Sequence, residues 1–170
     1  MTTRAALAVL LVLLHAACGK VATIAAKPQE PGPDAIGFYC RMTLAEHQGP
    51  KGQVLLKGWK DPLWFSSVRD ALTYAQGEVV SDNEVAGFWV NDMAQGTWEK
   101  PAPGSWIEAK AAHYVVGSTK SSGMGGVETV PFRNRDAAEA FAKQYGGSVT
   151  DYASALRSVA KQDDAGGGGT

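Results

Sequence analysis

The chain has 170 residues, of which 45% are hydrophobic and 19% are charged, and its formal net charge is −1. This is enough apolar material for the core of one domain or of two small ones. A near-neutral charge without basic clusters provides no electrostatic footprint for nucleic acid, which excludes that class of partner. After residue 20 no apolar run is long enough to span a bilayer, so any membrane association must come from the N-terminus.

Residues 1–17 have the pattern of an export signal peptide. Arg4 supplies a positive start, and residues 5–14 form an apolar stretch that is too short to span a membrane. Small residues then precede Cys18, which resembles the lipobox cysteine that becomes the acylated first residue of bacterial lipoproteins. His15 stands where lipoboxes usually have an aliphatic residue. The alternative is cleavage after Ala17 or a neighbouring alanine without lipidation.

The two cysteines limit what the thiols can do. If Cys18 is lipidated, Cys40 is the one free thiol of an exported chain and has no disulfide partner. A Cys18–Cys40 disulfide would require an unlipidated Cys18. A lone thiol in an oxidising compartment calls for burial, reactivity or a metal. Because Gly19 gives no inner-membrane retention signal, we expect a periplasm-facing lipoprotein anchored in the outer membrane.

Composition divides the mature chain into three parts. Residues 18–35 contain a dense run of proline and glycine and are predicted to be a lipidated N-terminus and flexible linker. Residues 36–160 form the folded domain. Residues 161–170 contain a run of four glycines before Thr170 and are predicted to be a disordered tail.

The first half of the domain predicts two strands, a helix and a third strand. Residues 37–42 and 53–56 are expected to pair as a hairpin across the glycine-rich turn between them. Apolar residues at helical spacing follow through residue 76, with Leu63 to Phe65 leading into the helix and Ser66 or Ser67 as its cap. Residues 84–90 alternate in polarity, which is typical of a strand.

A similar unit follows in the second half. Strands are predicted over 112–117 and 127–132, then a helix that begins after Asn134 and stops at the Gly146–Gly147 pair. In both halves a phenylalanine shortly precedes Arg-Asp-Ala at the helix start. We therefore predict an α+β fold of two similar β-β-α-β modules, over about 36–100 and 101–160. Residues 151–161 could add a terminal amphipathic helix.

The stretch from Cys40 to His47 is the candidate functional site. If residues 38–42 are extended, the side chains of Cys40 and Met42 point to the same face, because residues two apart in a strand share a face. A thiol with a thioether is a soft ligand pair, which favours Cu(I). His47 and Met124 could add an imidazole and a second thioether. The competing interpretation is that both sulfurs of the Cys-x-Met triplet are ordinary half-buried strand atoms.

Other chemistry finds little support in the sequence. The chain has no Cys-x-x-Cys, no phosphate-binding Gly-x-x-x-x-Gly-Lys-Ser/Thr loop and no Gly-x-Ser-x-Gly. One thiolate with a thioether suits zinc poorly.

Several short motifs, taken in order, resemble the NosL family, which are accessory lipoproteins of nitrous oxide reductase. In chain order these motifs are Cys40-Arg-Met42, His47, Gly49-Pro50-Lys-Gly-Gln53, Asp92, Gly96-Thr-Trp98, Ala111-Ala-His-Tyr-Val-Val-Gly-Ser118, Met124-Gly125 and the helix from Phe132 to Phe141. The likeness covers nearly the whole mature chain. Arg41 departs from the pattern, since the family often has glycine there.

The resemblance implies a Cu(I)-binding lipoprotein, not an enzyme, with Cys40 and Met42 as copper ligands. It also implies a role in supplying copper for the copper–sulfide centre of nitrous oxide reductase, whose apoprotein or assembly machinery would be the partner. His47 and Met124 are assigned as ligands by their chemistry. The alternatives are an enzyme like the organomercurial lyases, whose fold is similar by resemblance, and a lipoprotein that binds another assembly protein without metal.

Overall fold

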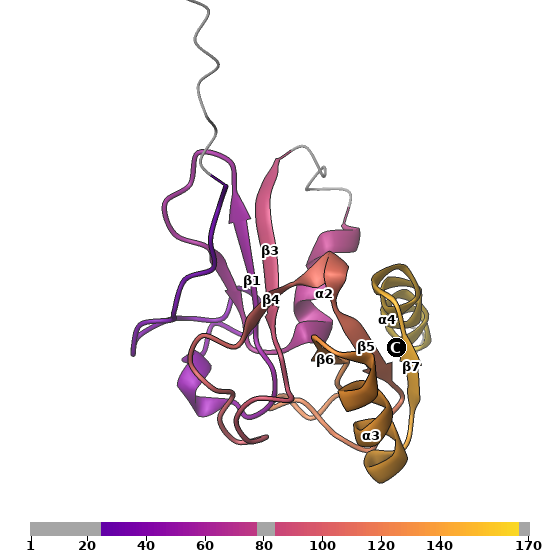
Figure 1. Ribbon diagram of the computed structural model, residues 1–170. Coiled ribbons are helices and arrows are strands. Elements are labelled where there is room, and N and C mark those ends of the chain that lie inside the picture. The colour runs from indigo at the N-terminus through magenta and orange to yellow at the C-terminus, as the bar shows by residue number, and fades with distance from the viewer. Residues whose placement is uncertain (1–24, 78–83, 167–170) are drawn as a thin grey trace, which may run out of the picture.

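A computed structural model describes residues 25–77 and 84–166 of the chain. The predicted signal peptide and Cys18 lie outside the described residues. Within them the chain forms two antiparallel sheets and three α-helices, with two short 3-10 turns, η2 (Leu44–Glu46) and η3 (Ala109–Ala111). In Figure 1 the strands of the first sheet lie on the left and those of the second on the right, with α2 between them. No helix of the described residues is long and apolar enough to cross a membrane.

The first sheet has the strand order β2-β1-β3-β4 and carries one helix. Its elements are β1 (Gly52–Leu56), β2 (Leu63–Phe65), α2 (Val68–Gln76), β3 (Val85–Asn91) and β4 (Trp106–Glu108). The central strand β1 pairs with β2 and β3, so the predicted hairpin with residues 37–42 is wrong. The segment Leu63–Phe65 was expected to lead into the helix and is instead a strand of this sheet.

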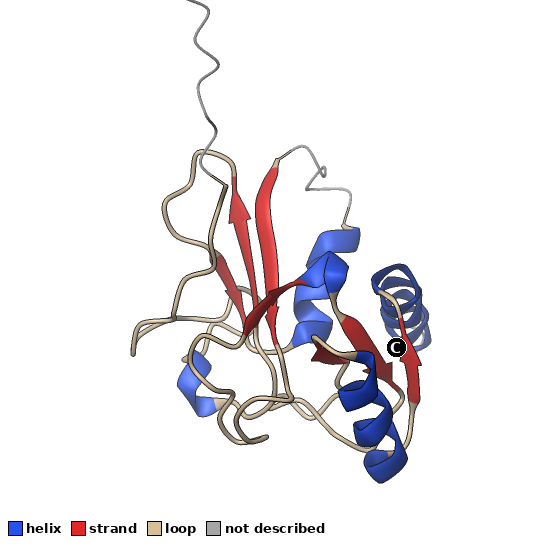
Figure 2. Ribbon diagram, viewed as in Figure 1, coloured by secondary structure: helices blue, strands red, loops and turns tan. Residues whose placement is uncertain are grey.

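The second sheet repeats this arrangement with the order β6-β5-β7. Its elements are β5 (His113–Val116), β6 (Val130–Phe132), α3 (Arg135–Tyr145) and β7 (Ser148–Thr150). In both sheets the first strand of the unit is central, the second and third strands flank it, and the helix joins the flanking strands (Figure 2). The predicted pair of β-β-α-β modules is therefore confirmed.

The helix boundaries follow from local sequence. Ser67 caps α2, and its Oγ accepts a hydrogen bond from Asp70 N at 3.0 Å. Asn134 precedes α3 in an extended conformation without a side-chain capping bond. Gly146 and Gly147 end α3 with φ values of 76° and 92°, which side chains other than glycine rarely adopt.

A shared core joins the two modules. Val90 of β3, Tyr114 of β5 and Leu72 of α2 belong to one buried cluster, which the last helix, α4 (Tyr152–Gly166), completes with Val159. Gln76 also donates a hydrogen bond to Leu156 O on α4 at 2.7 Å. The helix continues through Gly166, past residue 161, where the sequence predicts the start of a disordered tail.

The proline-rich segment before the domain is attached to it where the structure describes it. Gln29 N donates to Gln53 Oε1 at 2.9 Å, and Gln53 Nε2 donates back to Gln29 O at 2.9 Å. Glu30 Oε1 accepts from Gly104 N and from Trp106 Nε1, both at 2.9 Å. Proline stiffens this segment, and these bonds hold it against β1 and β4. These contacts are made by Gln29 and Glu30, within the segment that the sequence predicts to be a flexible linker.

Candidate metal centre

Cys40 lies in a tight loop and not in a strand. Residues 38–40 form a turn, in which Arg41 N donates to Gly37 O at 3.0 Å and Gly37 N donates to Met42 O at 2.9 Å. Arg41 has a φ of 58°, the one positive value at a non-glycine residue in the described part of the chain. Strand alternation therefore does not set the directions of Cys40 and Met42, and that step of the sequence argument was wrong.

The loop brings Cys40 to His47. Cys40 Sγ and His47 Nε2 are 3.9 Å apart. Two ligand atoms bound to one metal ion at about 2.0–2.3 Å stand roughly 3.5–4.4 Å apart, from tetrahedral to linear geometry. The two atoms can thus share an ion without a large movement. His47 is only 6% exposed, so its ring is held within the fold, whereas Cys40 is half-buried.

A second loop, which carries Met124, packs against His47. Residues 121–127 close on themselves through hydrogen bonds from Ser122 N to Gly126 O at 2.8 Å and from Gly125 N to Ser122 O at 2.9 Å. Gly123 packs directly on His47, since a β-carbon at Gly123 would stand 2.6 Å from His47 Cβ and 3.0 Å from Nδ1. The second module thereby contributes the neighbour of Met124 to a site that the first module begins.

The two methionines differ from His47 in exposure. Met42 is 43% exposed and Met124 is 52% exposed. Among the described residues, no three His, Cys, Asp or Glu side chains gather as a metal-binding group. A metal held by Cys40 and His47 must therefore take further ligands from thioether sulfur or from another molecule. A thiolate, an imidazole and thioethers form a donor set that suits Cu(I).

Apolar side chains surround the two loops at the surface. Large hydrophobic residues are exposed around Cys40 in the first loop and within the second: Ile36, Phe38, Tyr39, Met42, Met124 and Val127. Phe38 also packs against Phe65 and Tyr74, with ring centroids 5.9 and 5.4 Å away. An exposed apolar surface of this kind marks an interaction site in many proteins.

Two charged residues that the sequence did not single out are buried near the site. Lys51 is 7% exposed and Glu128 is fully buried. Burial lowers the pKa of Lys51 to about 8, a fall that the attraction of Glu128 and of Cys40 limits. Burial also raises the pKa of Glu128 to about 8, although backbone N–H groups of Arg69 and Thr129 stabilise its carboxylate. The sequence predicts the Gly-Pro-Lys-Gly turn at residues 49–52, but it does not predict that Lys51 is buried.

A cavity of about 420 Å³ opens beside His47 and Lys51. The N-terminal segment and the loop before β4 supply its other walls, which include Pro31, Pro101 and Trp106. His47 therefore borders a cavity, which the sequence did not predict.

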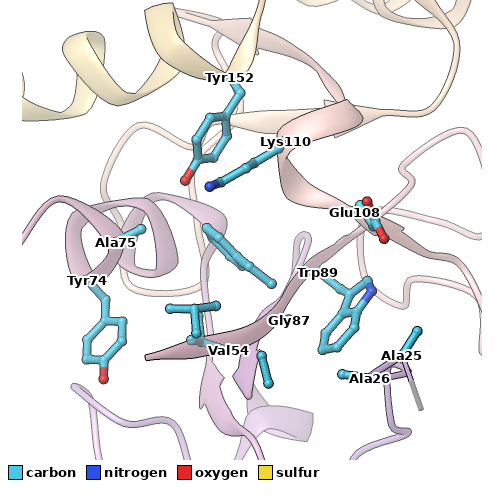
Figure 3. A pocket seen from close by; sticks show the side chains of 13 residues that line it. Ala25, Ala26, Val54, Tyr74, Ala75, Gly87, Trp89, Glu108, Lys110 and Tyr152 are labelled. Atoms are coloured by element: carbon cyan, nitrogen blue, oxygen red, sulfur yellow. The ribbon is translucent and has the colours of Figure 1, made fainter. Parts of the chain in front are cut away.

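A separate cavity of about 320 Å³ lies over β3 and contains none of the candidate ligands. Figure 3 shows Lys110 and Tyr152 at one side of it and Trp89 with Ala25 and Ala26 at the other. Without a thiol, thioether or imidazole, this cavity does not contribute to the candidate metal centre.

Comparison with known proteins agrees with this architecture. The family model NosL matches residues 28–159. The copper-binding lipoprotein NosL of Achromobacter cycloclastes is 46% identical over 139 residues, which cover 80% of this chain and 71% of that protein. The protein of the same name from Stutzerimonas stutzeri is 34% identical over 113 residues, which cover 65% of this chain and 56% of that protein.

A solved structure shares the fold. The crystal structure of the copper chaperone NosL from Shewanella denitrificans superimposes with a TM-score of 0.68 and 30% sequence identity, over 74% of this chain and 92% of that one. The matched family region contains both β-β-α-β modules, both loops of the candidate site and the buried Lys51 and Glu128. The chain belongs to the NosL family.

Proposed function

We propose that this protein is a copper chaperone that binds Cu(I) through Cys40, Met42, His47 and Met124. The observation that carries the proposal is the approach of Cys40 Sγ to His47 Nε2 at 3.9 Å, beneath a loop that presents a methionine. Relatives named copper-binding lipoprotein and copper chaperone support the choice of metal.

The four ligands have different tasks in this proposal. The Cys40 thiolate supplies most of the affinity, because thiolates are strong ligands for Cu(I). His47 is fixed by burial and gives the site its geometry. The thioethers of Met42 and Met124 are neutral, weak and exposed, so an incoming ligand can replace them one at a time. Copper then passes by ligand exchange without release of the free ion.

The recipient in this proposal is the assembly of the copper–sulfide centre of nitrous oxide reductase. The protein would be exported and held at the outer membrane by lipid on Cys18, with its copper site facing the periplasm. The exposed apolar residues around the two loops provide a surface on which a copper acceptor can dock. Metal transfer then requires the acceptor to present its own soft ligand at this surface.

Replacement of Cys40 tests the proposal. Anaerobic competition against a chromogenic Cu(I) chelator should show one tightly bound Cu(I) per wild-type chain and loss of tight binding in Cys40→Ser. Met93→Leu is a matched control, because Met93 packs in a core cluster of the second module. Unchanged Cu(I) affinity in Cys40→Ser would overturn the ligand assignment. A wild-type protein that binds no Cu(I) would favour the alternative, in which the lipoprotein binds another assembly protein without metal.

The enzyme alternative has little support from the described residues. Organomercurial cleavage by the resembling lyases needs a pair of cysteines, and Cys40 is the one cysteine in the described part of the chain. Release of inorganic mercury from an organomercurial by the purified protein would contradict the chaperone proposal.

A further inference from the structure

Lys51 places a buried positive charge next to the chain segment that follows His47. Its Nζ donates hydrogen bonds to the carbonyls of Gln48 at 3.1 Å and Gly49 at 2.7 Å, the two residues that follow His47. Two further bonds tie its backbone to Asn91 at the end of β3, from Lys51 N to Asn91 Oδ1 at 2.9 Å and from Asn91 N to Lys51 O at 3.1 Å. The fold therefore fixes where this ammonium lies.

The charge of Lys51 is not cancelled by its surroundings at neutral pH. With a pKa of about 8 the lysine is mostly protonated at pH 7. Glu128, which attracts the ammonium only when its carboxylate is ionised, is mostly neutral at the same pH because burial raises its pKa to about 8. Its Oε2 accepts no hydrogen bond, from Lys51 or from any other described residue. Lys51 and His47 line the same cavity, so the ammonium lies on the side of the fold where the ligand imidazole is held.

A fixed positive charge affects the two oxidation states of copper unequally. Coulomb repulsion grows with the product of the charges, so a nearby ammonium repels Cu(II) twice as strongly as Cu(I) at the same distance. The effect is large only where solvent does not screen it, which is the situation of a buried lysine. We propose that Lys51 biases the site toward Cu(I) over Cu(II), so that the cargo stays monovalent in an oxidising compartment. This inference rests on the proposed function.

Lys51 also has a structural task that must be separated from its charge. Its bonds to Gln48 and Gly49 hold the backbone next to His47, so any substitution can disturb the imidazole. A disturbed imidazole weakens the binding of both oxidation states. A lost charge instead changes the ratio of the two affinities, and this ratio distinguishes the two tasks.

The test compares four variants with wild type at pH 7. Lys51→Met removes charge and hydrogen bonds, Lys51→Gln removes the charge but keeps a donor, and Lys51→Arg keeps the charge. Lys100→Met is the control, since Lys100 lines the same cavity but is exposed. Dissociation constants for Cu(I) and Cu(II) are measured by competition with chelators specific for each state, after circular dichroism has confirmed folding.

We expect Lys51→Met and Lys51→Gln to lower the ratio of Cu(I) to Cu(II) affinity by about tenfold, which is a fall of about 59 mV in the midpoint potential of a one-electron couple. Lys51→Arg and Lys100→Met should stay within about threefold of wild type. If both neutral variants keep the wild-type ratio, the inference is overturned even when their affinities fall in parallel. A wild-type protein that fails to bind Cu(I) overturns the proposed function as well. If Lys51→Met does not fold, Lys51→Gln decides.

Discussion

The backbone of Gly123 lies directly against the side chain of His47, with room for no β-carbon between them. A methyl group at position 123 would stand 2.6 Å from His47 Cβ and 2.9 Å from its Cα, both of which belong to an anchored part of the chain. Contacts this short cannot be relieved by rotating a flexible side chain. The contact therefore sets how closely the loop of the second module, which carries Met124, approaches the site of the first.

The substitution Gly123→Ala should separate the two loops. We expect a destabilisation of about 1–3 kcal/mol from overpacking and a fall in Cu(I) affinity of about tenfold, because Met124 moves away from His47. Urea unfolding and chelator competition measure the two effects. Gly32→Ala is the control, since no atom lies within 4 Å of a β-carbon there and its φ is not positive. Wild-type affinity in Gly123→Ala would show that copper binding does not depend on the position of Met124.

Arg41 adopts a backbone conformation that favours glycine. Its φ of 58° lies in the left-handed region, which costs a side-chain-bearing residue about 1–2 kcal/mol. Glycine avoids this strain but adds entropy to the unfolded chain, worth about 0.5–1 kcal/mol. We expect Arg41→Gly to be as stable as wild type or up to about 1 kcal/mol more stable. Its Cu(I) affinity should not change, because the loop keeps its shape.

Arg41→Ala separates strain from side-chain contacts. This variant loses the guanidinium but keeps the left-handed backbone, so it should be less stable than Arg41→Gly by about 1 kcal/mol in urea unfolding. Equal stabilities for the glycine and alanine variants would show that the loop relaxes and stores no strain at this position.

Glu30 holds the proline-rich segment against the first sheet. One carboxylate oxygen accepts from Gly104 N and from Trp106 Nε1, both at 2.9 Å. Glu30→Ala removes both bonds, and we expect the free energy of unfolding to fall by about 1–2 kcal/mol. Limited proteolysis should cut residues 25–35 faster in this variant. Lys27→Ala, an exposed change in the same segment, should leave both measurements unchanged, and equal cleavage rates would show that Gln29 alone suffices.

The repeated modules could be predicted because their information is local. Apolar spacing, Ser67 and the Gly146–Gly147 pair define the helices of each half, and the Phe-to-Arg-Asp-Ala similarity links them. The turn at residues 38–40 could not be predicted in the same way. Phe38 and Tyr39 have strand-forming side chains, but contacts distant in sequence decide their conformation, among them a 2.7 Å bond from Phe38 N to Trp64 O.

The sequence leads to the candidate ligands but not to how deeply the residues around them are buried. Soft side chains close together in sequence pointed to Cys40, Met42 and His47, and the structure brings Cys40 and His47 together through a loop where a strand was expected. Lys51 and Glu128 were missed because charged residues are usually exposed. Their burial depends on how the two modules pack, which no local pattern reveals.

Glu128 predicts how stability depends on pH. Burial raises the pKa of its carboxyl group from 4.5 to about 8. Between about pH 4.5 and 8 the folded protein therefore keeps a proton on Glu128 that the unfolded chain releases. The contribution of Glu128 to the free energy of unfolding falls as the pH rises through this range. Between about pH 8 and 10.5 Lys51 has the opposite effect, because the unfolded chain keeps a proton on this lysine that the folded protein has released. The contribution of Lys51 to the free energy of unfolding therefore rises with pH in this range.

The substitution Glu128→Gln should remove this pH dependence. Between pH 5 and pH 8 the free energy of unfolding, measured in urea, should fall less in Glu128→Gln than in wild type. The difference between the two falls should be about 1 kcal/mol or more, since each unit of pKa difference is worth about 1.4 kcal/mol. Glu139→Gln is the control, because Glu139 is exposed on α3 and pairs with Arg135 at 2.8 Å. Parallel stability curves for wild type and Glu128→Gln would mean that Glu128 is already ionised in the folded protein. In that case the carboxylate would offset the charge of Lys51, and the ammonium could not act on copper as an uncompensated charge.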